Sequence, residues 1–420
     1  MMALRLWHHD NILKGAGIKS MNIAHTNGAR TSINRLRPFV FSIIAAASFV
    51  LCTAQQPGDA RDRSASIEIP RMIDARFNET ALFLAGKEIP SGSSLHAYGQ
   101  GREYRAYGKR IDASWSRLQT SNLKKIETWR EKYLPGKYTD TVFYPFSGPD
   151  ILNALAFFPD GTEYIMFGLE SPGRIPDPHT QPPARLNAGL SGLSVALDNV
   201  LNVNYFKTVR MEKEVSTDSF NSIISVILFF LSRSDYEVVN VRHVWITDES
   251  TLTDTAPARK GGKSISGAEI LFRKDPSSPL KRVRYFQLNV IDNSLKTYTN
   301  FIPYLETYGR YTTILKSASY LMHNEDKFTK IRALVLGHSD FLLQDDSGAA
   351  LRYFPTDTWK LTFHGTYSKP VPLFAHRYQA DLNEMIKKHS TGPLPFSYGY
   401  NFKENESNLM FAERIRKDQK

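Results

Sequence analysis

The chain has 420 residues, of which 41% are hydrophobic and 23% charged, a composition that can bury a globular core. Its formal net charge is +11, but no run of five or six like charges occurs, so nothing supports nucleic-acid binding. Cys52 is the only cysteine, which excludes an internal disulfide and any site built from several thiols.

A basic, then apolar, then small-residue segment near the N-terminus has the layout of a secretory signal peptide. Arg35 and Arg37 precede the apolar run 39–51, which is too short for a bilayer-spanning helix of ~20 residues. If translation starts at Met1, the basic region before the apolar run is unusually long. A start at Met21 would give a basic region of more ordinary length.

Small residues after the apolar run predict where the signal is cut. Cys52 and Ala54 stand three residues and one residue before the cut, so we expect cleavage between Ala54 and Gln55. One alternative is a lipoprotein carrying its lipid on Cys52, although bulky Leu51 stands where such signals have a small residue. The other is a helix of a cytosolic domain, which the lack of acidic residues between 24 and 59 disfavours.

Cleavage would change the net charge and the cysteine content of the protein. Without residues 1–54 the chain has 47 basic and 41 acidic residues, a net charge of about +6, and no cysteine. A cysteine-free exported chain of this length can bury an adequate core and fits a bacterial periplasm. We therefore expect a periplasmic protein, with an outer-membrane lipoprotein through Cys52 as the alternative.

The predicted elements after the signal mix helices and strands. We expect a flexible leader over 55–66, a helical N-terminal layer over 67–135 and a mixed main domain over 136–420. Helices are predicted over 151–158, 186–203, 220–231, 311–323, 328–340 and 379–388. Strands are predicted over 142–146, 163–169, 237–247, 268–273, 282–290, 344–354 and 359–367. Without a regular βαβ period, this order predicts an α+β fold whose central sheet is mainly antiparallel and covered by helices.

The first candidate site is the segment 144–150, Tyr-Pro-Phe-Ser-Gly-Pro-Asp, together with Glu170 after the next strand. Ser147, Gly148 and Asp150 stand at the head of a predicted helix, where backbone N–H groups can meet a ligand. The structural alternative is a helix cap, with Asp150 complementing the helix dipole.

The second candidate site is the segment 343–348, Leu-Gln-Asp-Asp-Ser-Gly, followed by Arg352. Asp345 and Asp346 with Ser347 and a nearby arginine suggest a polar site in which one carboxyl group is held at a raised pKa. The structural alternative is a turn in which Arg352 pairs with one aspartate. Neighbouring residues of a strand point to opposite faces, so the two carboxylates need not share a site.

Two further patterns fall short of a catalytic motif. Ser339 lies between His338 and Asp340, but a nucleophile elbow needs a glycine where Phe341 stands. The histidines outside the signal are scattered and none forms a His-Glu-x-x-His pattern. We therefore expect no metal and no cofactor.

The segments 144–150 and 343–348, with Ser407-Asn408-Leu409, resemble a family of exported bacterial proteins that has no assigned activity. The resemblance covers roughly residues 75–415. It implies an exported bacterial protein and no catalytic residues.

Two functions remain open from the sequence. The first is a periplasmic or envelope-associated protein that binds a small molecule or an envelope component, without nucleic acid and without a transmembrane helix in the mature chain. The second is a hydrolase of envelope material with a carboxylate centre drawn from Asp345, Asp346, Asp150 and Glu170. Neither the substrate nor the oligomeric state follows from the sequence.

Overall fold

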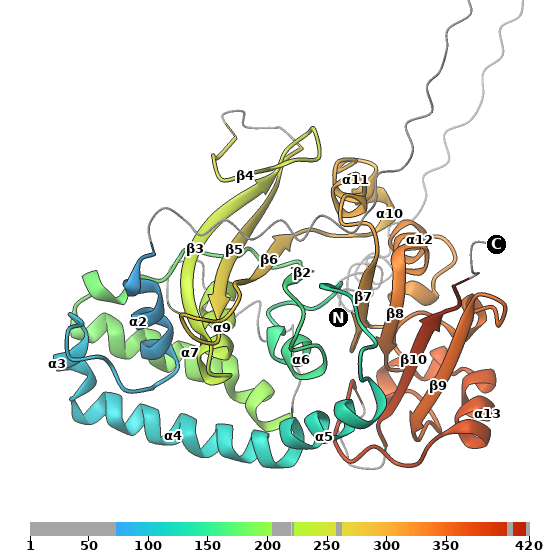
Figure 1. Ribbon diagram of the computed structural model, residues 1–420, viewed down its shortest axis with the longest axis horizontal. Coiled ribbons are helices and arrows are strands. Elements are labelled where there is room, and N and C mark those ends of the chain that lie inside the picture. Colours follow the sequence, from blue (N-terminus) through green and yellow to red (C-terminus); the bar gives the residue numbers. More distant parts are fainter. Residues whose placement is uncertain (1–72, 204–219, 221, 258–262, 401–405, 417–420) are drawn as a thin grey trace, which may run out of the picture. The chain divides into compact units, whose positions relative to one another are not determined.

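The computed structural model describes residues 73–203, 220, 222–257, 263–400 and 406–416. The predicted signal peptide, its cleavage site and the leader lie outside these ranges. Within them, helices surround one ten-stranded sheet, so the predicted α+β class with a helical N-terminal region is confirmed (Figure 1).

The sheet is mixed, which corrects the expectation of a mainly antiparallel one. Its strand order is β4-β3-β5-β6-β2-β1-β7-β8-β10-β9. The middle strands from β6 to β8 run parallel, while β4-β3-β5-β6 on one flank and β8-β10-β9 on the other are antiparallel. The strands are β1 (Thr141–Tyr144), β2 (Glu163–Gly168), β3 (Glu237–Ile246), β4 (Leu252–Thr253), β5 (Ile265–Arg273), β6 (Lys281–Gln287), β7 (Tyr311–Leu315), β8 (Ser339–Gln344), β9 (Trp359–Gly365) and β10 (Asn408–Arg414).

The N-terminal layer consists of helices whose apolar residues recur at helical spacing. Its elements are α2 (Ala75–Leu84), α3 (His96–Gly99), α4 (Arg102–Leu118) and α5 (Lys124–Tyr133), and a π-helical turn at Gln119–Leu123 joins the last two. In α4 the buried residues Tyr104, Tyr107, Ile111, Trp115 and Leu118 follow each other at intervals of three or four. Figure 1 shows α4 and α5 running nearly end to end below the strands.

The remaining helices connect strands or fill the core. They are α6 (Ile151–Phe157), α7 (Pro183–Val203), α9 (Ile223–Arg233), α10 (Asp292–Leu295), α11 (Phe301–Glu306), α12 (Thr329–His338) and α13 (Ala380–His389), with 3-10 turns at 178–180, 321–323, 351–353 and 372–377. All 11 residues of α9 are buried, as expected for a core helix. None of the helices in the described ranges has both the length and the apolar character needed to cross a bilayer.

Two predicted elements are wrong. Residues 311–323, predicted as helix, form strand β7 and then a tight turn. Residues 344–354, predicted as extended, leave β8 at Gln344 and continue as turns. Both errors fall where the chain leaves a parallel strand, and these exits form the candidate site.

Candidate functional site

The candidate site lies where the connections after β1 and β7 diverge. These strands are neighbours, but the chain leaves β1 towards β2 on one side and leaves β7 towards β8 on the other. Such a divergence opens a crevice at the carboxyl ends of parallel strands, where ligand sites commonly form. The segments that follow β1, β7 and β8 meet here, so the fold brings the two predicted segments, 144–150 and 343–348, to one place.

Asp150 forms a buried ion pair with Lys316, the first residue after β7. Its Oδ2 lies 3.0 Å from Lys316 Nζ, and the two side chains are 4% and 2% exposed. Oδ1 accepts a hydrogen bond from the backbone N–H of Asn153 at 3.2 Å, and Oδ2 accepts one from the Tyr144 hydroxyl at 3.0 Å. The interpretation of Asp150 as the N-cap of α6 is confirmed, and Lys316 balances its charge.

Asp345 is buried and surrounded by hydrogen-bond donors. Oδ1 accepts hydrogen bonds from the backbone N–H of Ser347 at 3.1 Å and from its hydroxyl at 2.5 Å, and Oδ2 accepts one from the N–H of Ser317 at 3.2 Å. These donors favour the charged form, but burial and the Asp346 carboxylate outweigh them and raise the pKa of Asp345 to about 7. A carboxyl group with this pKa can both accept and donate a proton near neutral pH.

The Asp346 carboxylate has hydrogen-bond partners different from those of Asp345. It accepts hydrogen bonds from the Tyr320 hydroxyl and, at 2.9 Å, from the side-chain amide of Asn408 on β10. Burial raises the pKa of Asp346, and these two hydrogen bonds oppose the rise. Within the described ranges, no group of three or more His, Cys, Asp or Glu side chains is arranged to hold a metal ion.

Backbone strain gathers in the loops that enclose the site. Phe146 after β1 has a φ of 62°, and Ser317, Ser319 and Tyr320 after β7 have φ values of 53°, 55° and 55°. Residues other than glycine enter this left-handed region at a cost, and such residues cluster at functional sites. The strain is therefore evidence that the loop conformation matters beyond local stability.

A segment before β10 packs against Asp345. Tyr398 is 1% exposed, and its hydroxyl has no hydrogen-bond partner among the described residues. Burial, and then the charges of Asp345 and Asp150, raise the pKa of Tyr398. Gly399 follows with a φ of 70°, and a Cβ at this position would stand 1.8 Å from Asp345 Oδ2. The segment thus leaves no room for a side chain at position 399.

The other predicted site residues are only partly brought together. Ser147 is buried and its hydroxyl donates to the carbonyl of Gly148 at 2.9 Å, inside the loop after β1. Glu170 follows β2 and is half-buried. Arg352 lies 2.6 Å from the Glu325 carboxylate, so the expected ion pair between Arg352 and one of the two neighbouring aspartates is wrong.

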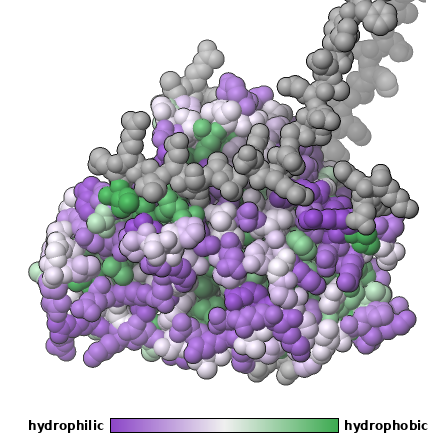
Figure 2. Space-filling view, viewed as in Figure 1, coloured by the Kyte–Doolittle hydropathy of each residue, from purple (hydrophilic) through white to green (hydrophobic). Residues whose placement is uncertain are grey.

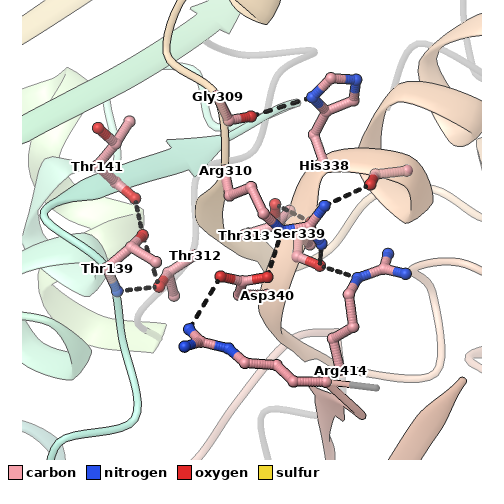
Figure 3. Close-up of polar contacts among 12 residues, drawn as sticks. Thr139, Thr141, Gly309, Arg310, Thr312, Thr313, His338, Ser339, Asp340 and Arg414 are labelled. Carbon is pink, nitrogen blue, oxygen red and sulfur yellow. Dashed lines mark hydrogen bonds and ion pairs between the residues drawn. The ribbon is translucent and has the colours of Figure 1, made fainter. Parts of the chain in front are cut away.

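Figure 3 shows the opposite, amino ends of β7 and β8, where Ser339 lies. His338 Nδ1 stands 3.0 Å from the carbonyl oxygen of Gly309, while the Asp340 carboxylate pairs with Arg310. The three consecutive side chains turn to separate partners, so this segment does not form a Ser-His-Asp relay.

A separate cavity of about 470 Å³ lies beside α5. Its lining combines residues of α5, one residue of β9 and the segment after α13: Lys124, Lys125, Thr128, Trp129, Lys132, Tyr133, His364, Thr391, Gly392, Pro393 and Pro395. Burial lowers the pKa of His364 to about 4, so this ring is neutral near pH 7 and the positive charge comes from the lysines. Asp150, Asp345 and Asp346 are not part of this lining.

Comparisons of the chain with protein-family models, with curated proteins and with solved structures gave no match.

Lys316, Tyr398 and the cavity were not predicted from the sequence. With residues 311–315 assigned to a parallel strand, Lys316 would have been expected at the same sheet edge as Asp150. The cavity also has a sequence signal, because Lys124, Lys132 and Trp129 fall on one face of a helix that starts at residue 124.

Proposed function

We propose that this chain is an exported bacterial protein, periplasmic or envelope-associated, that binds a ligand in the cavity beside α5. Export is supported by the basic, apolar and small-residue segment that ends at Ala54. The absence of cysteine from residues 55–420 agrees with this compartment, although it does not require it.

The observation that carries the binding proposal is the cavity. Its volume of about 470 Å³ falls within the ~300–1,000 Å³ of small-molecule sites. Its floor includes Trp129, which is 5% exposed and packs edge-on against His364 at a centroid distance of 4.8 Å. A preformed aromatic floor with polar groups around it is the usual composition of such a site.

Two measurements test export. The full chain expressed in a Gram-negative host should appear in the periplasmic fraction with Gln55 as its first residue, as read by N-terminal sequencing. Retention in the cytoplasm with residues 1–54 intact would overturn the export proposal. Incorporation of labelled palmitate that is lost in Cys52→Ala would instead establish the lipoprotein alternative.

Binding is tested with residues 55–420 in a thermal-shift and calorimetry screen against sugars, phosphates, peptides and metal ions. We expect at least one of these ligand classes to raise the melting temperature. Thr128→Trp should abolish that effect, because Thr128 lines the cavity and a bulky ring fills it. Glu131→Trp, at an exposed position of the same helix, should leave it intact. A screen that finds no stabilising ligand would contradict the proposal. Equal loss of the ligand-induced rise in melting temperature in Thr128→Trp and Glu131→Trp would contradict it as well.

A carboxylate-dependent hydrolase of envelope material is the second candidate. It is favoured by the raised pKa of Asp345 and by the strained loops at the carboxyl ends of the strands. It ranks second because Asp150, Asp345 and Asp346 are buried, so a substrate reaches them only if the loops move apart.

The hydrolase candidate is tested by incubating the mature protein with peptidoglycan and envelope polysaccharides and measuring released reducing ends. Activity that disappears in Asp345→Asn while the melting temperature is kept would support it. Activity at background level across pH 5–8 would exclude the hydrolase function.

A further inference from the structure

We propose that the ligand of the cavity beside α5 is a phosphomonoester carried on a ring-shaped body, such as a phosphorylated sugar. This inference names the ligand class of the proposed binding function and depends on that function.

The charged residues that line the cavity are all basic. Lys124, Lys125 and Lys132 lie on the face of α5 that lines the cavity. The acidic residues of the helix, Glu127 and Glu131, do not line it. They stand 3.8 and 3.7 Å from the guanidinium of Arg130, outside the cavity. The cavity therefore keeps a net positive rim and favours an anion.

The charge of the ligand distinguishes phosphate from carboxylate. Arginine recognises carboxylates and phosphates through a planar, two-pronged contact, whereas lysine acts as a compact point charge. The lining in the described part of the chain contains three lysines and no arginine. Lys124 and Lys132 are separated by two helical turns, ~12 Å, so their flexible side chains can approach one group from opposite sides. A doubly charged phosphate gains from several point charges more than a singly charged carboxylate does.

The rest of the lining suits the body of such a ligand. Tyr133 and Trp129 supply apolar surface, and Pro393 and Pro395 add two stiff residues to the lining. The Thr391 hydroxyl lies 2.5 Å from His364 Nδ1, which fixes one polar group at the edge of the cavity. Aromatic surface next to fixed hydroxyl groups matches a sugar ring, which has apolar faces and polar edges.

The surface around α5 is hydrophilic. In the view shared by Figures 1 and 2, hydrophilic side chains predominate along the part of the surface where α4 and α5 lie. Lys124 and Lys132 are exposed, so replacing either should leave the fold intact.

Calorimetric titration of residues 55–420 with a hexose 6-phosphate, the free hexose, a hexuronate and inorganic phosphate tests the inference. We expect the sugar phosphate to bind at least tenfold more tightly than the free hexose and the hexuronate. Its affinity should rise from pH 5 to pH 7, because a phosphomonoester loses its second proton near pH ~6. Vesicles that present a phosphorylated glycolipid separate a membrane-borne ligand from a free one.

Lysine variants locate the bound phosphate. Lys124→Ala and Lys132→Ala should each weaken binding of the sugar phosphate about 5- to 10-fold. Lys330→Ala, at an exposed position on α12, is the matched control and should leave the affinity unchanged.

The two proposals fail in different ways. Equal affinity for the sugar phosphate and the free hexose, or equal effects of all three lysine variants, would overturn the phosphate assignment and leave a binding protein with another ligand. If neither these probes nor the broad screen gives a ligand that Thr128→Trp excludes, the binding function itself is wrong.

Discussion

Replacing Lys316 by methionine should lower the free energy of unfolding much more than replacing a surface lysine does. Methionine keeps most of the length of the side chain but removes the ammonium group that lies 3.0 Å from Asp150 Oδ2. Among the described residues, Asp150 would then keep its hydrogen bonds from the Tyr144 hydroxyl and Asn153 but lose its ion-pair partner.

The size of the effect follows from burial. At an effective dielectric constant of 20, two unit charges 3 Å apart attract each other by ~5 kcal/mol, and desolvation of both groups offsets much of this gain. Removing one partner from a buried pair leaves the other charge uncompensated, which typically costs ~3–5 kcal/mol. We expect Lys316→Met to lower the free energy of unfolding by this amount.

Urea unfolding of residues 55–420, followed by circular dichroism, measures the effect. Lys87→Met is the matched control, because Lys87 and Asp235 also form an ion pair but have side chains 27% and 79% exposed. This exposed pair should contribute ~0–1 kcal/mol. The double variant Lys316→Met/Asp150→Asn should be more stable than the sum of the single effects predicts, since no lone charge remains. A loss for Lys316→Met as small as that of the control, with additive single effects, would refute the reasoning.

Two further predictions concern the same site. Burial and Asp346 raise the pKa of Asp345 from 3.8 to about 7, so the folded state holds a proton that the unfolded chain releases. The free energy of unfolding should therefore fall as the pH rises from ~4 to ~7, by up to ~4 kcal/mol from this group. In Asp345→Asn, the midpoint of urea unfolding should depend less on pH across this range than in the unchanged protein. Gly399→Ala should cost ~3–5 kcal/mol in urea unfolding, because its Cβ meets a carboxylate oxygen and its φ is positive. Gly136→Ala, with a φ of 65° but open space, should cost only ~1–2 kcal/mol; equal losses in the two glycine variants would contradict the close packing described for the site.

The sequence predicted well the elements whose signal is local. The apolar spacing of α4, the largely apolar run of α9 and the apolar stretch of β2 all match the structure. Their periodicity or length is sufficient evidence, since each element buries a recognisable pattern of side chains.

Elements that depend on distant partners were predicted poorly. Residues 311–315 are rich in β-branched side chains, yet they were assigned to a helix over 311–323, and in the structure they pair as a strand with β1 and β8. Strand β10 was not predicted, because its pairing partners β8 and β9 lie far away in the sequence. The parallel direction of the central strands depends on crossovers that no local pattern specifies.

The candidate site was predicted in part for the same reason. Asp150, Asp345 and Asp346 were found because they stand in distinctive short segments. Lys316 and Tyr398 complete the cluster, yet each is an isolated residue that only the strand order brings to the site. Burial of the whole cluster could not be predicted, since it depends on how three loops close over one another.

The position of β10 has a consequence for biosynthesis. This strand follows β8 and β9 in the sequence but lies between them in the sheet, so neither can complete its pairing until residues 408–414 have left the ribosome. Asn408, which donates a hydrogen bond to Asp346, becomes available only together with β10. Because segments fold as they emerge, this flank of the sheet and the hydrogen bond to Asp346 form only after β8 and β9 have both been synthesised.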